Sequence, residues 1–294
     1  PRGRRQLRPM STVTVRLLGG LGNQMFQYAA GLAVAERHGS KLRLDPSYIT
    51  FEAHRAYALD VLKVRATVSN RRRVPRWVFD RPGLDEAIVK RRFRASVERE
   101  REHPYNPEIE SAPANAYLIG YWQSEKYLDP VSDQLRRDLR PREIGPKAAL
   151  MADRIRQTDR SVAVHVRRGD YIDVEQTRTL HGVCSSDYYT RAASLIAERA
   201  GDSTHFVFSD DPDWARKNLK LPGETVIASD SHEAHEDLHL ISQCTHAIIA
   251  NSSFSWWGAW LGETGKSIVV APENWFAEMP LDYSDIVPQR WIRL

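Results

Sequence analysis

Short apolar runs alternate with amphipathic segments along most of this chain. The runs are rich in Val, Ile and Leu and have the length of buried strands, whereas the segments between them repeat apolar residues at the period of a helix. The pattern predicts strands at residues 13–18, 41–44, 116–119, 162–166, 205–208, 225–227, 247–250 and 267–270. It predicts helices at residues 25–38, 131–139, 147–156, 187–198, 212–219, 233–242 and 254–261.

Strands that alternate with helices at this interval pair in parallel, so the pattern predicts an α/β fold with doubly wound sheets. Residues 140–146 hold two prolines and a glycine between two predicted helices, which is typical of a linker. We therefore expect a first domain over residues 11–143 and a second over residues 144–294. Residues 1–10 have no apolar core, and we expect a disordered leader or a cloning remnant there.

The formal charge of +4 on this 294-residue chain comes from the leader. Four of its 42 basic residues are arginines that precede Met10, and the other 38 balance the 38 acidic residues. A neutral body argues against a nucleic-acid-binding protein. Basic clusters at residues 71–73 and 90–94 are interspersed with acidic residues, so we expect residues 61–102 to form a solvated helical face.

The sequence also limits where the protein works. No apolar run reaches the length of about eighteen residues that a membrane-spanning helix needs. The two cysteines, Cys184 and Cys244, are far apart and match no metal or disulfide spacing. We therefore expect a protein of the reducing cytoplasm.

Polar side chains gather where the strands of the second half end. His165, Arg167 and Arg168 stand at the end of one predicted strand, residues 209–211 follow the next, and residues 251–253 precede a helix. Because parallel strands end at one edge of their sheet, we expect these groups to meet. Arginine forks and helix N-termini both favour phosphate oxygens, so the sequence predicts a site for an anionic ligand.

The first predicted strand runs into a glycine loop at residues 19–24 and then into a helix. Such a loop lets the backbone approach a phosphate closely. The loop lacks the third glycine of the dinucleotide-binding fingerprint, which argues against a nucleotide-dependent dehydrogenase. Tyr121 and Trp122 stand in a stretch of aromatic, amide and charged residues that suits a sugar, although core packing explains each ring equally well.

Asp210 and Asp211 invite a metal interpretation, because paired carboxylates bind divalent ions. The neighbouring arginines already supply positive charge for phosphates, and a carboxylate can instead accept hydrogen bonds from the N1–H and amino group of guanine. We therefore expect neither a metal nor a further cofactor.

Five motifs occur in order along the chain: LGGLGNQMFQY at residues 18–28, GYWQSE at 120–125, HVRRGDY at 165–171, FSDD at 208–211 and NSSFSWWGAW at 251–260. In these motifs the chain resembles the bacterial α-1,2-fucosyltransferases of glycosyltransferase family 11. The resemblance implies a GT-B fold, in which two Rossmann-like domains face each other across a cleft. It also implies the reaction of a galactoside 2-α-L-fucosyltransferase: inverting, metal-independent transfer of L-fucose from GDP-β-L-fucose to the 2-hydroxyl of a terminal galactose.

The resemblance assigns roles to individual residues as well. It implies that Arg167 contacts the donor diphosphate, that His165 lies against the nucleotide and that Asp210 binds guanine. The full set that it implies for the donor is Gly20, Leu21, Gly22, Asn23, His165, Arg167, Arg168, Asp210, Asn251, Ser252 and Ser253. The catalytic residues that we expect are Arg167, Asp170 and Asn23, and the acceptor contacts that we expect are Tyr121, Trp122 and His181.

Inversion requires a base that removes a proton from the acceptor hydroxyl, and Asp170 and His181 are both candidates. A fucosyltransferase of another linkage, such as a protein O-fucosyltransferase, would share the donor site. A non-catalytic nucleotide- or nucleic-acid-binding protein is the alternative of a different class. The acceptor glycan, the oligomeric state and contact with the inner-membrane surface stay open.

Overall fold

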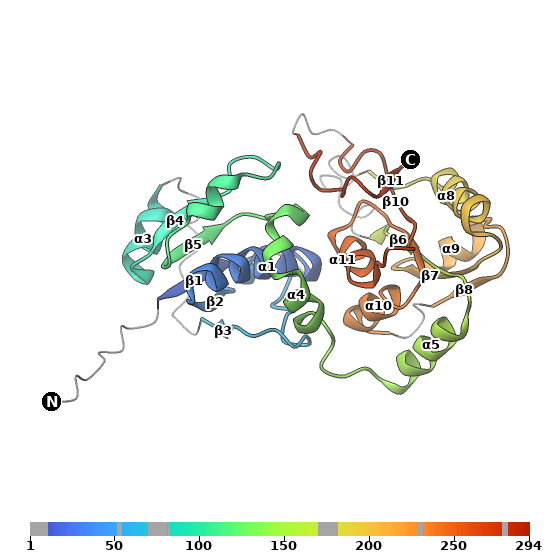
Figure 1. Cartoon of the computed structure of the whole chain (residues 1–294), viewed down its shortest axis with the longest axis horizontal. Coiled ribbons are helices and arrows are strands. Elements are labelled where there is room, and N and C mark those ends of the chain that lie inside the picture. Colours follow the sequence, from blue (N-terminus) through green and yellow to red (C-terminus); the bar gives the residue numbers. More distant parts are fainter. Residues whose placement is uncertain are drawn as a thin grey trace. The chain divides into compact units, whose positions relative to one another are not determined.

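The computed structural model describes residues 11–51, 55–69, 81, 83–169, 182–228, 232–277 and 282–294 (Figure 1). The chain divides into two compact units, Pro1–Leu139 and Arg140–Leu294. Each unit contains a parallel sheet with helices packed against it, so the predicted α/β class is confirmed. The leader and the basic cluster at residues 71–73 lie outside the described residues.

The sheet of the first unit has the strand order β3-β2-β1-β5-β4. Its strands are β1 (Thr12–Arg16), β2 (Lys41–Asp45), β3 (Thr67–Val68), β4 (Ser96–Arg99) and β5 (Ala116–Ile119). The pairing is parallel throughout. The chain proceeds from β1 outward to β3 and then builds the other side of the sheet, so the topology switches between β1 and β5.

Helix α1 (Leu21–His38) lies against this sheet and is buried along most of its length. Gly31 sets how closely it packs, because a Cβ atom there would lie 2.2 Å from Cγ2 of Val15 on β1. Gly39 ends the helix in the left-handed region, with φ of 59°. The helix begins at Leu21, before the first residue of the apolar pattern, so the second half of the predicted glycine loop is its first turn.

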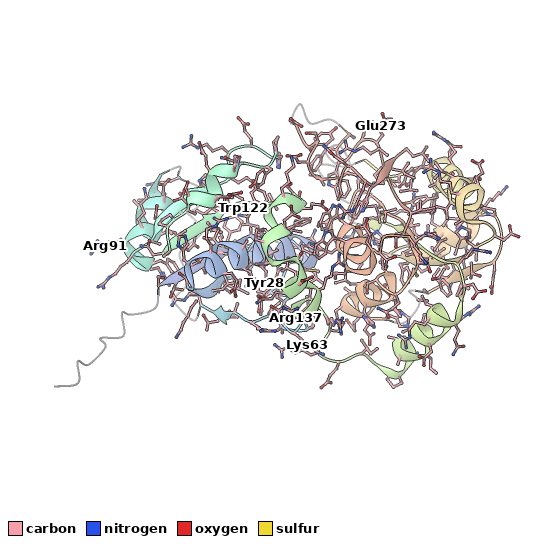
Figure 2. The ribbon with its side chains drawn as sticks, in the orientation of Figure 1. Tyr28, Lys63, Arg91, Trp122, Arg137 and Glu273 are labelled. Carbon is pink, nitrogen blue, oxygen red and sulfur yellow. The ribbon has the colours of Figure 1, made fainter. Side chains whose placement is uncertain are left out.

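The first unit also contains, among its described residues, α3 (Leu84–Phe93), α4 (Ser132–Asp138) and the 3-10 turns η1 (Ile49–Phe51), η2 (Pro107–Ser111), η3 (Glu125–Tyr127) and η4 (Asp129–Val131). Buried Tyr28 of α1 donates a 2.8 Å hydrogen bond to Asp138, which also pairs with Arg65. Figure 2 labels Tyr28 among the densely packed side chains of this unit and Arg91 at its margin. The buried pair fixes the end of α4 to α1.

The predicted solvated helical face over residues 61–102 is correct for only part of the described segment. Residues 84–93 form helix α3, in which Asp85 and Val89 alone are buried, but residues 96–99 form strand β4, and Asp85 is only 4% exposed. Its carboxylate pairs with buried Arg16 at 3.2 Å and with Arg99 at 2.9 Å. The physical reason is that the arginine at the end of β1 is buried and therefore needs a counter-charge.

The second unit has the strand order β11-β10-β9-β6-β7-β8. Its strands are β6 (Ser161–Val166), β7 (Thr204–Ser209), β8 (Thr225–Ile227), β9 (His246–Ile248), β10 (Val269–Ala271) and β11 (Ile292–Arg293). Within the described residues its helices are α5 (Pro146–Gln157), α8 (Ser186–Ala200), α9 (Pro212–Asn218), α10 (Ala234–Ile241) and α11 (Ser253–Gly262). This is the strand order of a Rossmann fold, in which the topology switches between the first and fourth strands, here β6 and β9.

We predict that Gly31→Ala destabilises the protein. The added methyl overlaps Val15 and Leu42, and overpacking of this kind costs about 1–3 kcal/mol, more than the roughly 1 kcal/mol that alanine gains from helix propensity. Urea unfolding measures the effect. Gly265→Ala, where a methyl meets no atom within 4 Å, is the matched control. Equal stability of the two variants would contradict the packing described for α1.

Candidate functional site

The switch point of the second unit gathers most of the residues predicted to bind the donor. Arg167 and Arg168 follow β6, Asp210 follows β7, and Asn251 and Ser252 lie between β9 and α11, whose first residue is Ser253. Strands β6, β7 and β9 are neighbours and parallel, so these residues share one edge of the sheet. In open α/β sheets ligands bind outside this edge, at the switch point.

Asp210 holds the loop that follows β6. Its carboxylate accepts hydrogen bonds from the backbone N–H of Arg168, at 2.8 Å, and of Gly169, at 3.0 Å. The same carboxylate pairs with the Arg167 guanidinium at 3.0 Å. Asp210 thus contacts the arginine loop directly through both of its carboxylate oxygens.

The two arginines of this loop have different surroundings. Arg168 lies 3.9 Å over the Trp214 ring and pairs with Asp211 at 3.3 Å, and its side chain is 17% exposed. Asp211 also caps α9 by accepting from the Trp214 N–H. The Arg167 side chain is 29% exposed and pairs with the Asp210 carboxylate at 3.0 Å. Arg167 is thus the more exposed of the two arginines.

His165 is buried beside the arginine loop, with its ring 5.4 Å from that of Phe254. Burial, together with the nearby charge of Arg167, lowers the pKa of His165 to about 3, so the imidazole is neutral at physiological pH. Its Nδ1 has no hydrogen-bond partner within the described part of the chain. A buried polar atom without a partner is costly, and a bound ligand or water would relieve that cost.

The N-terminus of α11 adjoins this position. Ser252 is the N-cap residue, but its side chain makes no capping hydrogen bond. The amides of a first helical turn have no partners inside the helix and carry partial positive charge, so they favour an anion. Asn251 differs from the serines, because its amide donates to the Trp275 carbonyl and its oxygen accepts from the Cys184 thiol.

The glycine loop of the first unit leads into α1, with Gly20 as N-cap and Leu21, Gly22 and Asn23 in the first turn. Two glutamines that the sequence analysis did not single out hold this loop. Gln24 donates to the Gly19 carbonyl at 2.9 Å, and Gln27 accepts from the Leu18 N–H at 2.9 Å. Both are fully buried.

The aromatic stretch after β5 meets Asn23 of this helix turn. The Gln123 side chain donates a 2.8 Å hydrogen bond to the Asn23 Oδ1. Tyr121 is exposed, whereas Trp122 is buried with its ring edge-on to Tyr127. Of the predicted acceptor contacts Tyr121, Trp122 and His181, Tyr121 is exposed, Trp122 is part of the core, and His181 lies outside the described residues.

Glu100 contacts the turn after β5 in the first unit and is not among the predicted site residues. Its carboxylate accepts hydrogen bonds from the backbone N–H groups of Tyr121, at 2.6 Å, and Trp122, at 3.0 Å. Burial nevertheless raises its pKa from the ordinary 4.5 to about 7. The signal in the sequence is weak, because Glu100 is one of many charged residues in its segment and its partners are backbone amides.

Asp170 and His181, the two predicted base candidates, lie outside the described residues. Within the described ranges no cluster of three or more His, Cys, Asp or Glu side chains is placed to hold a metal ion. Nor does any helix of those ranges have the length and apolarity needed to cross a membrane.

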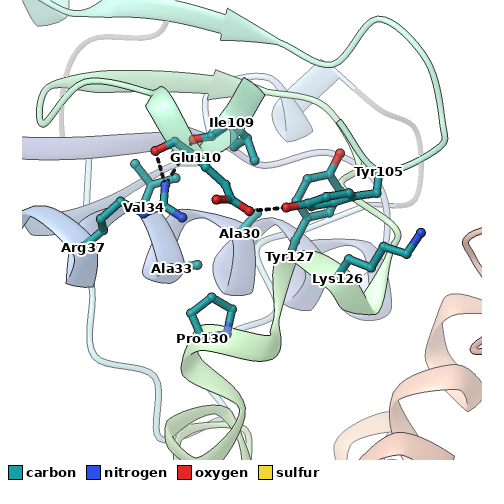
Figure 3. A pocket seen from close by; sticks show the side chains of 10 residues that line it. All are labelled: Ala30, Ala33, Val34, Arg37, Tyr105, Ile109, Glu110, Lys126, Tyr127 and Pro130. Atoms are coloured by element: carbon teal, nitrogen blue, oxygen red, sulfur yellow. Dashed lines mark hydrogen bonds between the residues drawn. The ribbon is translucent and has the colours of Figure 1, made fainter. Parts of the chain in front are cut away.

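A small pocket on the C-terminal half of α1 contains none of the predicted site residues (Figure 3). Arg37 donates to the Glu110 carbonyl there, and the Glu110 carboxylate accepts from Tyr105. The volume of about 20 Å³ suffices for roughly one water molecule. The pocket is therefore too small to bind a sugar.

The family model of glycosyl transferase family 11 matches residues 4–294. The chain belongs to glycosyltransferase family 11. It is 35% identical to an alpha-1,2-colitosyltransferase of Escherichia coli, over 97% of this chain and 99% of that protein. It is 28% identical to the galactoside alpha-(1,2)-fucosyltransferase 1 of Plecturocebus brunneus, over 96% of this chain and 74% of that protein. The membership inferred from the five motifs is confirmed.

Among solved structures, a mutant of Arabidopsis thaliana FUT1 in complex with GDP superimposes with a TM-score of 0.50 and 13% sequence identity. The match covers 91% of this chain and 72% of that one. At this identity the likeness concerns the fold, and it confirms the predicted GT-B type. The chain is thus a GT-B glycosyltransferase of family 11.

We predict that ionisation of Glu100 costs stability. A pKa raised in the folded chain means that the stabilisation it brings is complete below about pH 4.5 and is lost as the pH rises through 7. The free energy of unfolding of the wild type relative to Glu100→Gln should therefore fall by about 3 kcal/mol over that range. Urea unfolding of both proteins between pH 5 and pH 8 measures this difference, and a difference independent of pH would contradict the burial of an ionisable carboxyl.

Proposed function

We propose that this chain transfers L-fucose from GDP-β-L-fucose to the 2-hydroxyl of a terminal galactose, with inversion and without a metal. One observation carries the donor assignment: Arg167, the neutral His165 and the first turn of α11 meet at the switch point of the second unit. Together they offer a fixed cation, a neutral polar group and free amides, which are the groups that bind a nucleoside diphosphate. The two relatives named above support the α-1,2 linkage, because both names contain it.

The chemistry follows from charge. Departure of GDP places growing negative charge on the diphosphate while the sugar becomes oxocarbenium-like. Groups aimed at the diphosphate oxygens therefore stabilise the transition state more than the ground state. In this proposal Arg167 and the amides of α11 supply that stabilisation, with Ser252 and Ser253 as additional donors. Asp210 orients the Arg167 guanidinium and is the proposed contact to guanine.

The proton of the acceptor hydroxyl must go to a group other than His165, because a pKa of about 3 makes that imidazole a poor base at neutral pH. We keep Asp170 and His181 as the candidate bases. In the first unit, Asn23 and the amides of residues 20–22 are the proposed contacts to the donor, and Tyr121 is the proposed contact to the acceptor. No step in this scheme requires a metal.

The colitosyltransferase relative favours a second candidate donor, GDP-colitose. Colitose is fucose without its 3-hydroxyl. A site that hydrogen-bonds the 3-hydroxyl of fucose discriminates strongly against colitose, because its polar group is left without a partner. A site that only packs against the 3-position loses no contact when fucose binds, so it does not reject fucose on that ground. A fucosyltransferase of another linkage, protein O-fucosyltransferase included, stays the nearest alternative for the acceptor.

A donor and acceptor panel tests this function. We predict transfer from GDP-fucose to a terminal galactoside, with an α-1,2 linkage in the NMR spectrum of the product, and an unchanged rate in excess EDTA. Transfer from GDP-colitose alone would establish the second candidate. Another linkage in the product would establish a fucosyltransferase of different linkage. Transfer that EDTA inhibits would contradict the metal-free mechanism. No transfer from either donor would contradict the proposal as a whole.

We predict that Arg167→Ala lowers kcat for transfer by about 10²–10³-fold, the usual loss when a donor to a developing anion is removed. Arg167→Lys keeps the charge but not the planar fork, so its kcat should lie between those of the wild type and Arg167→Ala. Arg191→Ala, which removes an exposed arginine of α8, is the control. Near-normal turnover by a folded Arg167→Ala protein would rule out the proposed diphosphate contact.

A further inference from the structure

The turn after β5 is held from the neighbouring strand. Glu100 follows β4 directly, and its own N–H donates to the Ile119 carbonyl, which continues the ladder between β4 and β5. Its carboxylate then accepts the backbone N–H groups of Tyr121 and Trp122, at 2.6 and 3.0 Å. Two successive amides of the turn are thus bound by one side chain.

Two features of the turn accompany this contact. A Cβ atom at Gly120 would lie 2.4 Å from the Glu100 Cβ and 2.7 Å from its Oε2, so only glycine admits the carboxylate. Trp122 has φ of 58°, in the left-handed region that bulky residues avoid. The surroundings must impose a conformation of this kind, which costs of order 1 kcal/mol or more.

The turn after β5 also positions Gln123. This side chain is 8% exposed and donates to the Asn23 Oδ1 at 2.8 Å. Asn23 lies in the first turn of α1, behind the glycine loop proposed to contact the donor. A displaced turn would therefore release Asn23, although Glu100 itself touches neither Gln123 nor Asn23 through any of the contacts described.

The second unit contains the same arrangement. Asp210 directly follows β7 as Glu100 directly follows β4, and it binds the amides of Arg168 and Gly169. These amides stand two and three residues after the end of β6, as those of Tyr121 and Trp122 do after β5. The strand ends are also paired alike, Arg99 with Ile119 and Ser209 with Val166. In the second unit the loop held in this way carries Arg167.

We propose that Glu100 is a positioning residue for the transfer reaction: its carboxylate holds the turn at residues 120–123, so that Gln123 fixes the Asn23 side chain. The inference rests on the proposed function of the glycine loop. It assigns to Glu100 an effect on turnover that passes through Gln123 and requires no contact with either substrate.

A double-mutant cycle tests this path. Glu100→Gln keeps one acceptor oxygen but turns its side-chain NH2 group toward the second backbone N–H, so that two donors face each other. We expect this variant to lower kcat/KM roughly tenfold to a hundredfold. Gln123→Ala should have a similar effect, and the double variant should be no worse than the poorer single variant, because both act on Asn23. Glu102→Gln, an exposed carboxylate on the same segment, is the control and should match the wild type.

Losses that multiply in the double variant would overturn the proposal, as would a Glu100→Gln protein with wild-type turnover. If Glu100→Gln does not fold, Glu100→Asp enters the same cycle, since it keeps the charge but lacks the reach to both amides. If the wild type is active and the Glu100 variant has the same kcat/KM, this inference is refuted and the proposed function is left intact.

An inactive wild type refutes the proposed function, and amide hydrogen exchange then decides the inference separately. Exchange that is faster in Glu100→Gln at residues 121–122 and at residues 21–24, but unchanged in Glu102→Gln, supports positioning. Exchange that is unchanged, or faster only at residues 121–122, overturns it.

Discussion

Each unit holds the loop of its switch-point strand with a carboxylate that accepts two successive backbone amides. Glu100 holds the turn after β5, and Asp210 holds the loop after β6. A loop that leaves a sheet has amides without ladder partners, and these must be satisfied for the loop to keep one conformation. A single carboxyl group does this at two positions at once, with charge-assisted bonds when it is ionised. The side chains proposed to contact substrate, Arg167 and Asn23, take their places from these two loops.

The same carboxylates also set the local charge. Asp210 lies against Arg167, and Asp211 with the Trp214 ring holds Arg168, so two adjacent guanidiniums coexist at one strand end. His165 is neutral beside them, because burial and the charge of Arg167 both lower its pKa. In the proposed function, an anion at this edge meets Arg167 and the first turn of α11. In the first unit no arginine pairs with Glu100 through any described contact, and burial raises its pKa instead.

Much of the fold could be predicted because the strands of the second unit are apolar runs bounded by polar ends. Strands such as β4 could not, since Ser96–Arg99 contains one apolar residue among four, and β11 has only two residues. The gathering of Arg167, Asp210 and Ser252 at one edge followed from parallel topology. The contacts among them did not, because Asp210 binds backbone amides, which no sequence pattern displays. The contacts of Glu100, Gln123 and Asp85 could not be predicted for a related reason. Their partners lie at distant sequence positions that only the folded sheet brings close.

The proposed function depends most on the binding of a nucleoside diphosphate at the switch point of the second unit. A crystal structure of the protein with GDP tests this assignment most directly. The account predicts phosphate oxygens within hydrogen-bond distance of the Arg167 guanidinium and of the amides in the first turn of α11, with His165 Nδ1 or a water bound to it facing the nucleotide. The result that would contradict the proposal is a diphosphate bound away from Arg167, with the contact between Arg167 and Asp210 intact and no phosphate at the first turn of α11.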